Sequence, residues 1–236
     1  VLDQRRPGTF RTSLTPWSDG IRVKTRAPFK TPWRTVQIAP NAAALLNSSL
    51  ILNLNDPCAL DDVSWIKPGK VLREVTLTTA GAIAAIDFTS SHNMQYVEFD
   101  AGWYGPENND SSDARAVNLD PARSKGPLDM KEVLDYARSK DIGILLYVNR
   151  RALERQIDEL LPLYRDWGIA GIKFGFVRVG TQDATAWLHE SIVKAAKYKL
   201  VADVHDEYRP TGFSRTYPNF LTMEGIRGDE ESPSNS

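Results

Sequence analysis

Hydrophobic and polar positions follow two different patterns along this chain. In the first fifty residues, short apolar or alternating runs are separated by prolines and show no helical period. Such a sequence pattern is typical of strands and loops. After residue 60, apolar runs of strand length alternate with stretches whose apolar positions recur at the helical period. We therefore expect β-structure and loops first, and repeated strand–helix units afterwards. The three N-terminal runs are residues 22–25, 33–38 and 50–54.

The second part of the chain predicts a parallel sheet. Its strand candidates are continuous apolar runs, as expected of parallel strands buried on both faces. The helical pattern is clearest where Leu153, Ile157 and Leu160 fall on one side. Repeated units of roughly 30 residues fit a (β/α)8 barrel or a doubly wound sheet. The expected strands are residues 63–65, 96–99, 142–148, 169–177, 200–204 and 220–223, and the expected helices are residues 79–92, 128–140, 151–167 and 183–198.

The polar ends of these strands favour the barrel. Polar or acidic residues follow nearly every strand candidate, and barrels carry their chemistry at the C-terminal strand ends. No glycine-rich phosphate loop follows the first strand, which counts against a Rossmann nucleotide site. About six strands are found, too few to close a barrel. We therefore expect an α/β fold of the TIM type, a (β/α)8 barrel that is incomplete within this chain.

Carboxylates gather in the C-terminal part of the chain. One apolar run ends in His205, Asp206 and Glu207, and a second ends in Glu224, with the acidic residues 229–231 close behind. Carboxylates at one rim of a sheet repel each other unless a cation or a shared proton offsets the repulsion. The pattern therefore predicts a metal site, an acid/base site or both. A solvated acidic tail is the alternative for residues 229–231.

Composition excludes several classes of function. The formal net charge is −1 and 25% of residues are charged, so there is no electrostatic case for a nucleic-acid or anionic-membrane partner. Cys58 is the lone cysteine, which excludes an intramolecular disulfide, a cysteine zinc site and a CxxC motif. No run approaches the roughly 18 apolar residues of a membrane span, and no signal peptide starts the chain.

Several uncommon residues at fixed spacing carry a family resemblance. The most specific run is RPTGFSRTYPN at residues 209–219, followed by Glu224-Gly225 and Arg227-Gly-Asp-Glu230. In these motifs the chain resembles glycoside hydrolase family 97. Members of this family are secreted bacterial α-glucosidases and α-galactosidases of the type found in gut Bacteroides. The other matching segments are TPWR at 31–34, LNLNDP at 52–57, SWIKPG at 64–69, YVEFDAGW at 96–103 and GIAGIKFGFV at 168–177.

The resemblance implies an architecture and a setting. Members combine an N-terminal β-super-sandwich, a (β/α)8 barrel and a C-terminal β domain. On this interpretation, residues 1–50 are the end of the sandwich and its linker, and residues 51–236 are about the first six units of the catalytic barrel. The missing barrel strands and flanking β domains of the parent protein would be its structural partners. The implied location is periplasmic or secreted, and the implied substrate is an oligosaccharide or glycoside.

The resemblance also implies a calcium site and a general acid. Family members bind Ca²⁺ through carboxylates, and Glu224 and Glu230 fall on two ligand positions, with Asp206 on or next to a third. Hard carboxylate oxygens suit Ca²⁺. Glu230 also matches the acid that protonates the leaving glycosidic oxygen. The alternatives are an exposed tail acid for Glu230, and for Glu224 a strand-end acid paired with Arg215 or Arg227.

Gly175 bears on the reaction mechanism. Retaining members resembling this chain carry an Asp nucleophile here, whereas the chain reads Lys173-Phe-Gly-Phe176, which cannot form a glycosyl–enzyme ester. Inverting members carry glycine and use carboxylate bases from other strand ends, so Asp206 is the expected base, with Glu207 as the second candidate. Inverting relatives place a further base Glu where this chain has Asn149, which cannot take a proton. A close-packing or bulge glycine is the alternative interpretation of Gly175.

Four further residues are expected to contact sugar. Asp100 and Trp103 combine a carboxylate with an aromatic ring, as sugar pockets do, although a loop-capping acid and a core tryptophan are the alternative. Lys173 beside carboxylates fits either a substrate contact or a structural ion pair. His205 precedes the acids and fits a substrate contact or a satisfied core histidine.

The leading hypothesis is a glycosidase that cleaves terminal α-linked glucosides or galactosides by inversion, with Glu230 as the acid and a carboxylate-activated water. One alternative is a catalytically impaired carbohydrate-binding barrel. Another is a retaining enzyme whose nucleophile position 175 was changed to Gly. A metal-dependent aldolase or isomerase has less support, because no Schiff-base lysine context or phosphate loop is present.

Overall fold

A six-stranded parallel sheet organises the chain, for which a computed structural model describes residues 2–205 and 211–225. Strands that are consecutive in the sequence are neighbours in the sheet, as the right-handed strand–helix–strand unit requires. This is the expected α/β arrangement of a partial barrel. The strands, in sheet order, are β3 (Val71–Glu74), β4 (Tyr96–Phe99), β5 (Gly143–Asn149), β6 (Gly171–Gly175), β7 (Val201–Val204) and β8 (Phe220–Met223).

Four long helices lie close to their predicted positions. Their starts are set by polar N-caps: the Asp129 side chain accepts from the Glu132 amide, and the Thr181 side chain accepts from the Ala184 amide. One helix ends at Gly168, whose φ of 84° is the left-handed conformation that glycine adopts readily. The helices are α3 (Thr79–Ser91), α4 (Met130–Ser139), α5 (Arg150–Trp167) and α6 (Gln182–Lys197).

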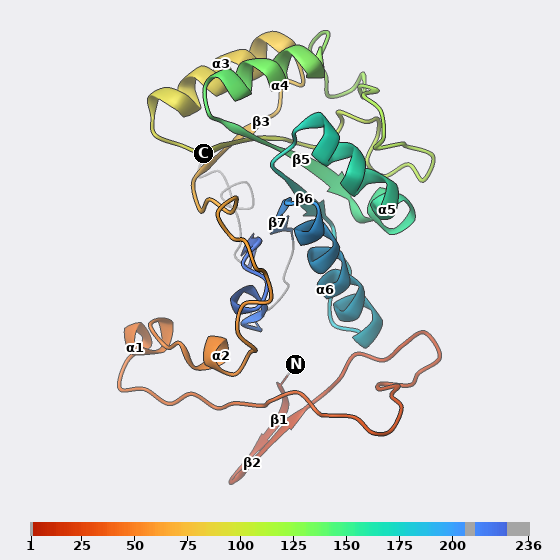
Figure 1. The fold of residues 1–236 in the computed structure, drawn as a ribbon. Coiled ribbons are helices and arrows are strands. Elements are labelled where there is room, and N and C mark those ends of the chain that lie inside the picture. The colour runs from red at the N-terminus through yellow and green to blue at the C-terminus, as the bar shows by residue number, and fades with distance from the viewer. Residues whose placement is uncertain (1, 206–210, 226–236) are drawn as a thin grey trace, which may run out of the picture.

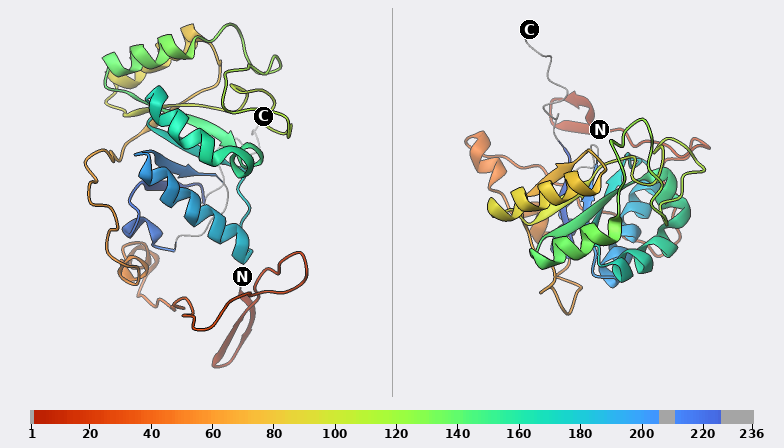
Figure 2. Two further views of the ribbon diagram at one scale, coloured as in Figure 1. Left: turned by 45° about the vertical axis from the view of Figure 1, so that its right-hand side comes forward. Right: turned by 90° about the horizontal axis from the view of Figure 1, so that it is seen from above.

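The outer face of the curved sheet carries the core. Figures 1 and 2 show helices α3 to α6 arranged along this one side. Because strand side chains alternate between faces, every second residue of each strand packs against these helices. The burial of these apolar side chains is what holds sheet and helices together. The outer-facing strand residues in the main core include Val97, Phe99, Leu146, Val148, Ile172, Phe174, Ala202 and Val204.

The inner face is different, and the continuous apolar runs did not predict it. Among the residues that the structure describes, the buried apolar side chains on this face form a small cluster of Tyr96, Leu145 and Val201. Two residues further toward the C-terminal end of each strand, the inner positions are polar or charged. Lys173, for example, pairs in register with Tyr147 on one side and with Asp203 on the other. In a barrel this face lines the interior, so polar chemistry is directed toward the C-terminal ends of the strands.

The N-terminal part differs from expectation. Strands β1 (Leu2–Arg6) and β2 (Thr9–Thr12) form an antiparallel hairpin, whereas residues 22–25 and 33–38 form no strand. These two predictions were wrong because an alternating run becomes a strand only beside a partner, and here Val36 and Ile38 are exposed. The run at 50–54 is a short helix, α2 (Leu50–Asn53), which follows α1 (Ala42–Leu46).

The first barrel strand was also misplaced. Residues 63–65 lie in a turn in which the Asp62 carboxylate accepts from the Ser64 amide at 2.9 Å, an interaction that favours turns over strands. The first strand is β3, slightly further on. A short 3₁₀ helix, η1 (Phe213–Arg215), precedes β8. No helix in the described ranges is long and apolar enough to cross a lipid bilayer.

Candidate active site

Two predicted site residues meet at the ends of neighbouring strands. His205 follows β7, and Glu224 follows β8, where its amide donates to the Val204 carbonyl at 2.8 Å. The side chains lie close, with His205 Nε2 3.3 Å from Glu224 Oε2. The His205 ring also contacts Phe176, with ring centroids 4.6 Å apart. Parallel pairing of β7 with β8 therefore gathers these groups at one edge, as the strand-end pattern predicted.

The most important carboxylates of the sequence analysis lie outside the described residues. Asp206 and Glu207, the expected bases, and Glu230, the expected acid, are in this group, so their roles stay predictions. Within residues 2–205 and 211–225, no group of three or more His, Cys, Asp or Glu side chains could hold a metal ion. Glu224 is the one expected calcium ligand in that range, and it pairs with His205 rather than with Arg215.

The inner face below the strand ends holds a group of charges. Asp100 is half-buried and lies 3.3 Å from Arg73, measured from Oδ2 to Nε, while its Oδ1 accepts from the Ala101 amide. Burial raises the pKa of Glu98 to about 8, against the opposing effect of the Lys173 ammonium. Burial likewise raises the pKa of Asp203, again opposed by Lys173. Lys173 is therefore near enough to both carboxylates to oppose the rise in their pKa.

Trp103 is placed differently from the sugar-contacting role expected of it. Its side chain is fully buried, and its Nε1 donates to the Tyr147 carbonyl at 2.8 Å. The ring packs edge-on against Tyr104 and Tyr164. No surface of the ring is left for a sugar, so its position fits the alternative of a core tryptophan. Asp100, by contrast, keeps partial exposure at the end of β4.

Gly175 ends β6 and faces the Tyr147 side chain. A Cβ atom added at Gly175 would lie 2.2 Å from Tyr147 Cζ and 2.3 Å from its Oη, far inside van der Waals contact. The Tyr147 ring is buried, and its hydroxyl donates to Glu107 Oε2. Tyr147 thus occupies the space that any side chain at position 175 would need. A close approach by a neighbour is one physical reason for glycine in a strand.

Glu107 is a buried carboxylate that the sequence did not single out. It is 8% exposed, and besides the Tyr147 hydroxyl its Oε2 accepts from Asn149 Nδ2 at 3.2 Å. Arg123 Nη2 donates to the other oxygen at 3.0 Å. Glu107 lies in the long loop between β4 and α4, where no periodicity or motif marks it. The available signal was an acid in a long loop that follows a strand end, and such loops are often functional.

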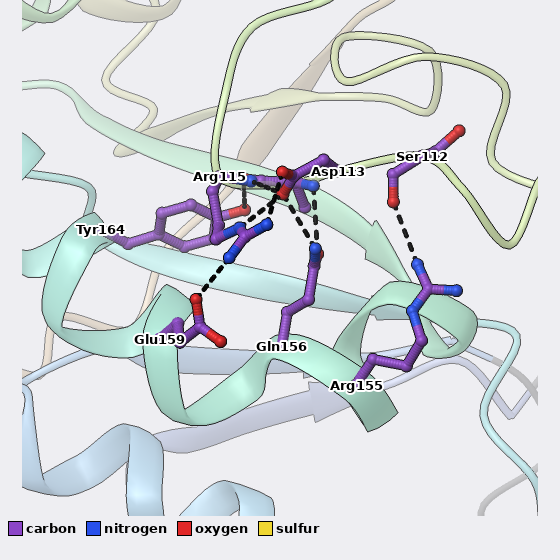
Figure 3. Close-up of polar contacts among 8 residues, drawn as sticks. Ser112, Asp113, Arg115, Arg155, Gln156, Glu159 and Tyr164 are labelled. Atoms are coloured by element: carbon purple, nitrogen blue, oxygen red, sulfur yellow. Dashed lines mark hydrogen bonds and ion pairs between the residues drawn. The ribbon is translucent and has the colours of Figure 1, made fainter.

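Helix α5 anchors this loop by its polar contacts, which Figure 3 shows. Asp113 accepts from Gln156 Nε2 at 2.8 Å, and Arg115 bridges Asp113 and Glu159. The buried Tyr164 hydroxyl donates to the Ala114 carbonyl at 2.8 Å. These contacts tie the loop to a rigid helix, so Glu107 is held over the ends of β5 and β6.

Comparisons with known proteins place the chain in a family. The family model described as Glycoside hydrolase 97 matches residues 65–226, and the Glycosyl-hydrolase 97 N-terminal model matches residues 4–57. A Bacteroides thetaiotaomicron protein named "Retaining alpha-galactosidase" is 34% identical over 224 residues, covering 89% of this chain and 32% of that protein. A Streptomyces bingchenggensis protein named "Probable retaining alpha-galactosidase" is 29% identical over 235 residues, covering 94% and 35%.

A solved structure agrees. A Glycoside Hydrolase Family 97 enzyme from Pseudoalteromonas sp. strain K8, in complex with acarbose, matches with a TM-score of 0.82 and 29% identity, covering 97% of this chain and 40% of that one. The chain spans about one third of the length of the two curated relatives. Because the main family model covers well over half of it, the chain belongs to glycoside hydrolase family 97.

Proposed function

We propose that the protein containing this chain is a glycosidase that releases terminal α-linked sugars, glucosides or galactosides, by a single inverting displacement. The observation that carries the proposal is the pair Gly175 and Tyr147. A retaining enzyme needs a carboxylate close to the sugar carbon to form the covalent intermediate. Position 175 offers no side chain, and Tyr147 fills the room that one would need. Two relatives carry "alpha-galactosidase" in their names, which supports the substrate class.

Those relatives are also named retaining, so the proposed stereochemistry separates this chain from them. In the inverting reaction, Glu230 donates a proton to the leaving oxygen while Asp206, or Glu207 next to it, removes a proton from the attacking water. The bond from that water to the anomeric carbon forms as the glycosidic bond breaks. Acid and base must stand roughly 6.5–9.5 Å apart to admit the water. We expect Asp206, which follows β7 in the sequence, and Glu230, which follows β8, to meet this spacing.

The described inner face supports sugar binding near these acids. Lys173 offers an ammonium group, Asp100 a partly exposed carboxylate and His205 a ring at the same edge of the sheet. Charged donors and acceptors of this kind recognise sugar hydroxyls by hydrogen bonds. We propose these three residues as substrate contacts. Lys173 lies in register with Asp203 on the neighbouring strand β7, so a positive charge offsets that carboxylate.

Calcium is part of the proposal. Glu224 supplies a half-buried carboxylate oxygen of the kind that Ca²⁺ prefers, and Asp206 and Glu230 would complete the protein's share of the site. Bound there, the ion would polarise oxygens of the substrate. We expect a chelator to lower the thermal midpoint of the whole protein and added Ca²⁺ to restore it, because a ligand of the folded state stabilises that state. An unchanged midpoint would count against the site.

Two further proposals concern the setting of the chain. Residues 1–50 would belong to a β-super-sandwich and its linker, and residues 51–236 to the barrel. The location would be periplasmic or secreted. Proteolysis of the whole protein followed by mass spectrometry tests the boundary, since linkers are cut before folded domains.

The deciding experiment follows the product by NMR. The whole protein is mixed with an aryl α-glucoside and, separately, an aryl α-galactoside, and the anomer released first is recorded. We expect the β-anomer, and E230Q should lose most activity on a substrate with a poor leaving group. First release of the α-anomer would overturn inversion. Sugar binding without any hydrolysis would instead favour a carbohydrate-binding barrel.

A further inference from the structure

The loop after β4 brings a carboxylate to a place where the strand ends themselves lack one. Asn149, at the end of β5, cannot accept a proton, yet its Nδ2 lies 3.2 Å from Glu107 Oε2. The same amide lies 3.4 Å from the Tyr147 hydroxyl. Asn149 Oδ1 is used elsewhere, since it accepts from the Arg151 amide as the N-cap of α5. The asparagine is thereby fixed with its amide directed at Glu107 and Tyr147.

Glu107 has two oxygens with different surroundings. Oε1 accepts from Arg123, whose side chain is about half exposed, so this oxygen makes the ion pair. Oε2 faces inward, where it accepts from the Tyr147 hydroxyl and the Asn149 amide. The ion pair with the half-exposed arginine accounts for the position of Oε1 but not for the burial of Oε2. The inward oxygen is the terminal acceptor of a chain of hydrogen bonds.

The other end of that chain lies beside Gly175. Tyr147 Oη lies 2.3 Å from where a Cβ at position 175 would be, so the hydroxyl fills the space in which a side chain at that position would begin. A tyrosine hydroxyl has two lone pairs and one proton. Here the proton is donated to Glu107, and one lone pair receives the Asn149 amide. The second lone pair can accept from a water beside the anomeric carbon.

We infer that Tyr147 and Glu107 form a proton relay for the attacking water, with Glu107 as the second carboxylate of the site. The inference rests on the proposed inverting glycosidase function. The strand-end carboxylate, Asp206 or Glu207, accepts a hydrogen bond from the attacking water and orients it. As the water oxygen bonds to the anomeric carbon, the proton that it loses passes to Tyr147 Oη instead of directly to that carboxylate, and the Tyr147 proton passes to Glu107 Oε2. The glycosidic bond breaks, and the leaving oxygen takes its proton from Glu230. Tyr147 ends neutral, as it began, and Glu107 ends protonated.

The surroundings of Tyr147 fit a relay rather than a nucleophile. Burial and the hydrogen bond to the Glu107 carboxylate raise the pKa of Tyr147 above its usual range, so its phenolate is disfavoured. A hydroxyl that gains and loses a proton in one step needs no stable phenolate. The loop contacts to α5 hold Glu107 in place before substrate arrives, and such preorganisation is what a proton transfer requires.

The test compares E107Q and Y147F in the whole protein with E154Q. E107Q keeps the shape of the side chain but cannot take a proton, and Y147F keeps the ring but breaks the relay. E154Q is the matched control, because Glu154 also pairs with an arginine, Arg178, but makes none of the contacts that anchor the loop. We expect kcat on an α-glycoside to fall about 10²-fold or more in both relay variants, with KM unchanged. E154Q should keep the unmodified rate.

A solvent isotope effect separates a relay from a structural role. In the relay step the water proton and the Tyr147 proton both move, so a plot of kcat against the deuterium fraction of the solvent should curve. Y147F removes the transfer through the hydroxyl and should reduce this curvature. A purely structural role would leave the shape of the plot unchanged.

A rescue variant completes the design. In the E107Q background, N149D places a carboxylate beside the Tyr147 hydroxyl and keeps a good N-cap for α5. We expect this double variant to recover part of kcat. If E107Q and Y147F keep kcat and the curved isotope plot while the protein inverts normally, the relay is wrong and the proposed function stands. If the unmodified protein hydrolyses no α-glycoside, the proposed function fails and the relay with it.

Discussion

Replacing Gly175 by alanine tests the central packing observation. The new Cβ would lie 2.2 to 2.4 Å from three atoms of the Tyr147 ring, so the ring or the strand must move by more than an ångström. Tyr147 cannot swing away cheaply, because it is buried and its hydroxyl donates to Glu107. Overpacking of this kind costs about 1–3 kcal/mol. Alanine also restricts the unfolded chain more than glycine does, which stabilises the folded state by about 0.4–1 kcal/mol. We expect Gly175→Ala to destabilise the fold by about 1–2 kcal/mol.

The assay is urea unfolding, with a double-mutant cycle that includes Tyr147→Ala. In that background the clash is gone, so Gly175→Ala should be neutral or slightly stabilising, with a coupling energy of about 2 kcal/mol. Gly126→Ala is the control, because its Cβ would meet only Thr78 Cγ2 at 3.4 Å, an ordinary contact. An equal cost of Gly175→Ala in both backgrounds would show that Tyr147 does not fill this space, and the argument for inversion would fall.

Three further predictions concern single side chains. Burial raises the pKa of Glu98 to about 8 in the folded state, so the folded state holds a proton that the unfolded state releases between pH 4.5 and 8. The free energy of unfolding should therefore fall across that window by up to about 1.4 kcal/mol per pH unit. In urea titrations at several pH values, E98Q should make this loss smaller. Tyr164→Phe removes the donor to the buried Ala114 carbonyl and should cost about 1–2 kcal/mol in the same assay; no loss would mean that α5 does not anchor the loop. Phe176 has a φ of 47°, so Phe176→Gly should relieve about 1 kcal/mol of backbone strain and raise the thermal midpoint. A lower midpoint would show that the ring contact with His205 outweighs the strain.

The regular elements could be predicted because their signals are local. The helical period from Leu153 to Leu160 and the apolar run at β4 each depend on a few neighbouring residues, so the helix and the strand lie within about two residues of expectation. The strand prediction at residues 63–65 was wrong for the same reason. The alternating run Val63-Ser64-Trp65 has the local pattern of a strand, but the Asp62 side chain stabilises a turn there. The strand predictions for the N-terminal runs were wrong because a strand needs a partner strand, which local sequence does not specify.

For the site, the sequence by itself determined which groups end the strands. Parallel pairing then brings these groups together, and His205 meets Glu224 because β7 and β8 end at the same edge of the sheet. Only the tertiary structure decided that Trp103 is core, that Tyr147 fills the space at Gly175, and that Glu107 reaches Asn149. These outcomes depend on the path of a long loop and on the volume of side chains that are distant in the sequence. Periodicity carries no information about either, because it reports which face a residue occupies and not what it meets there.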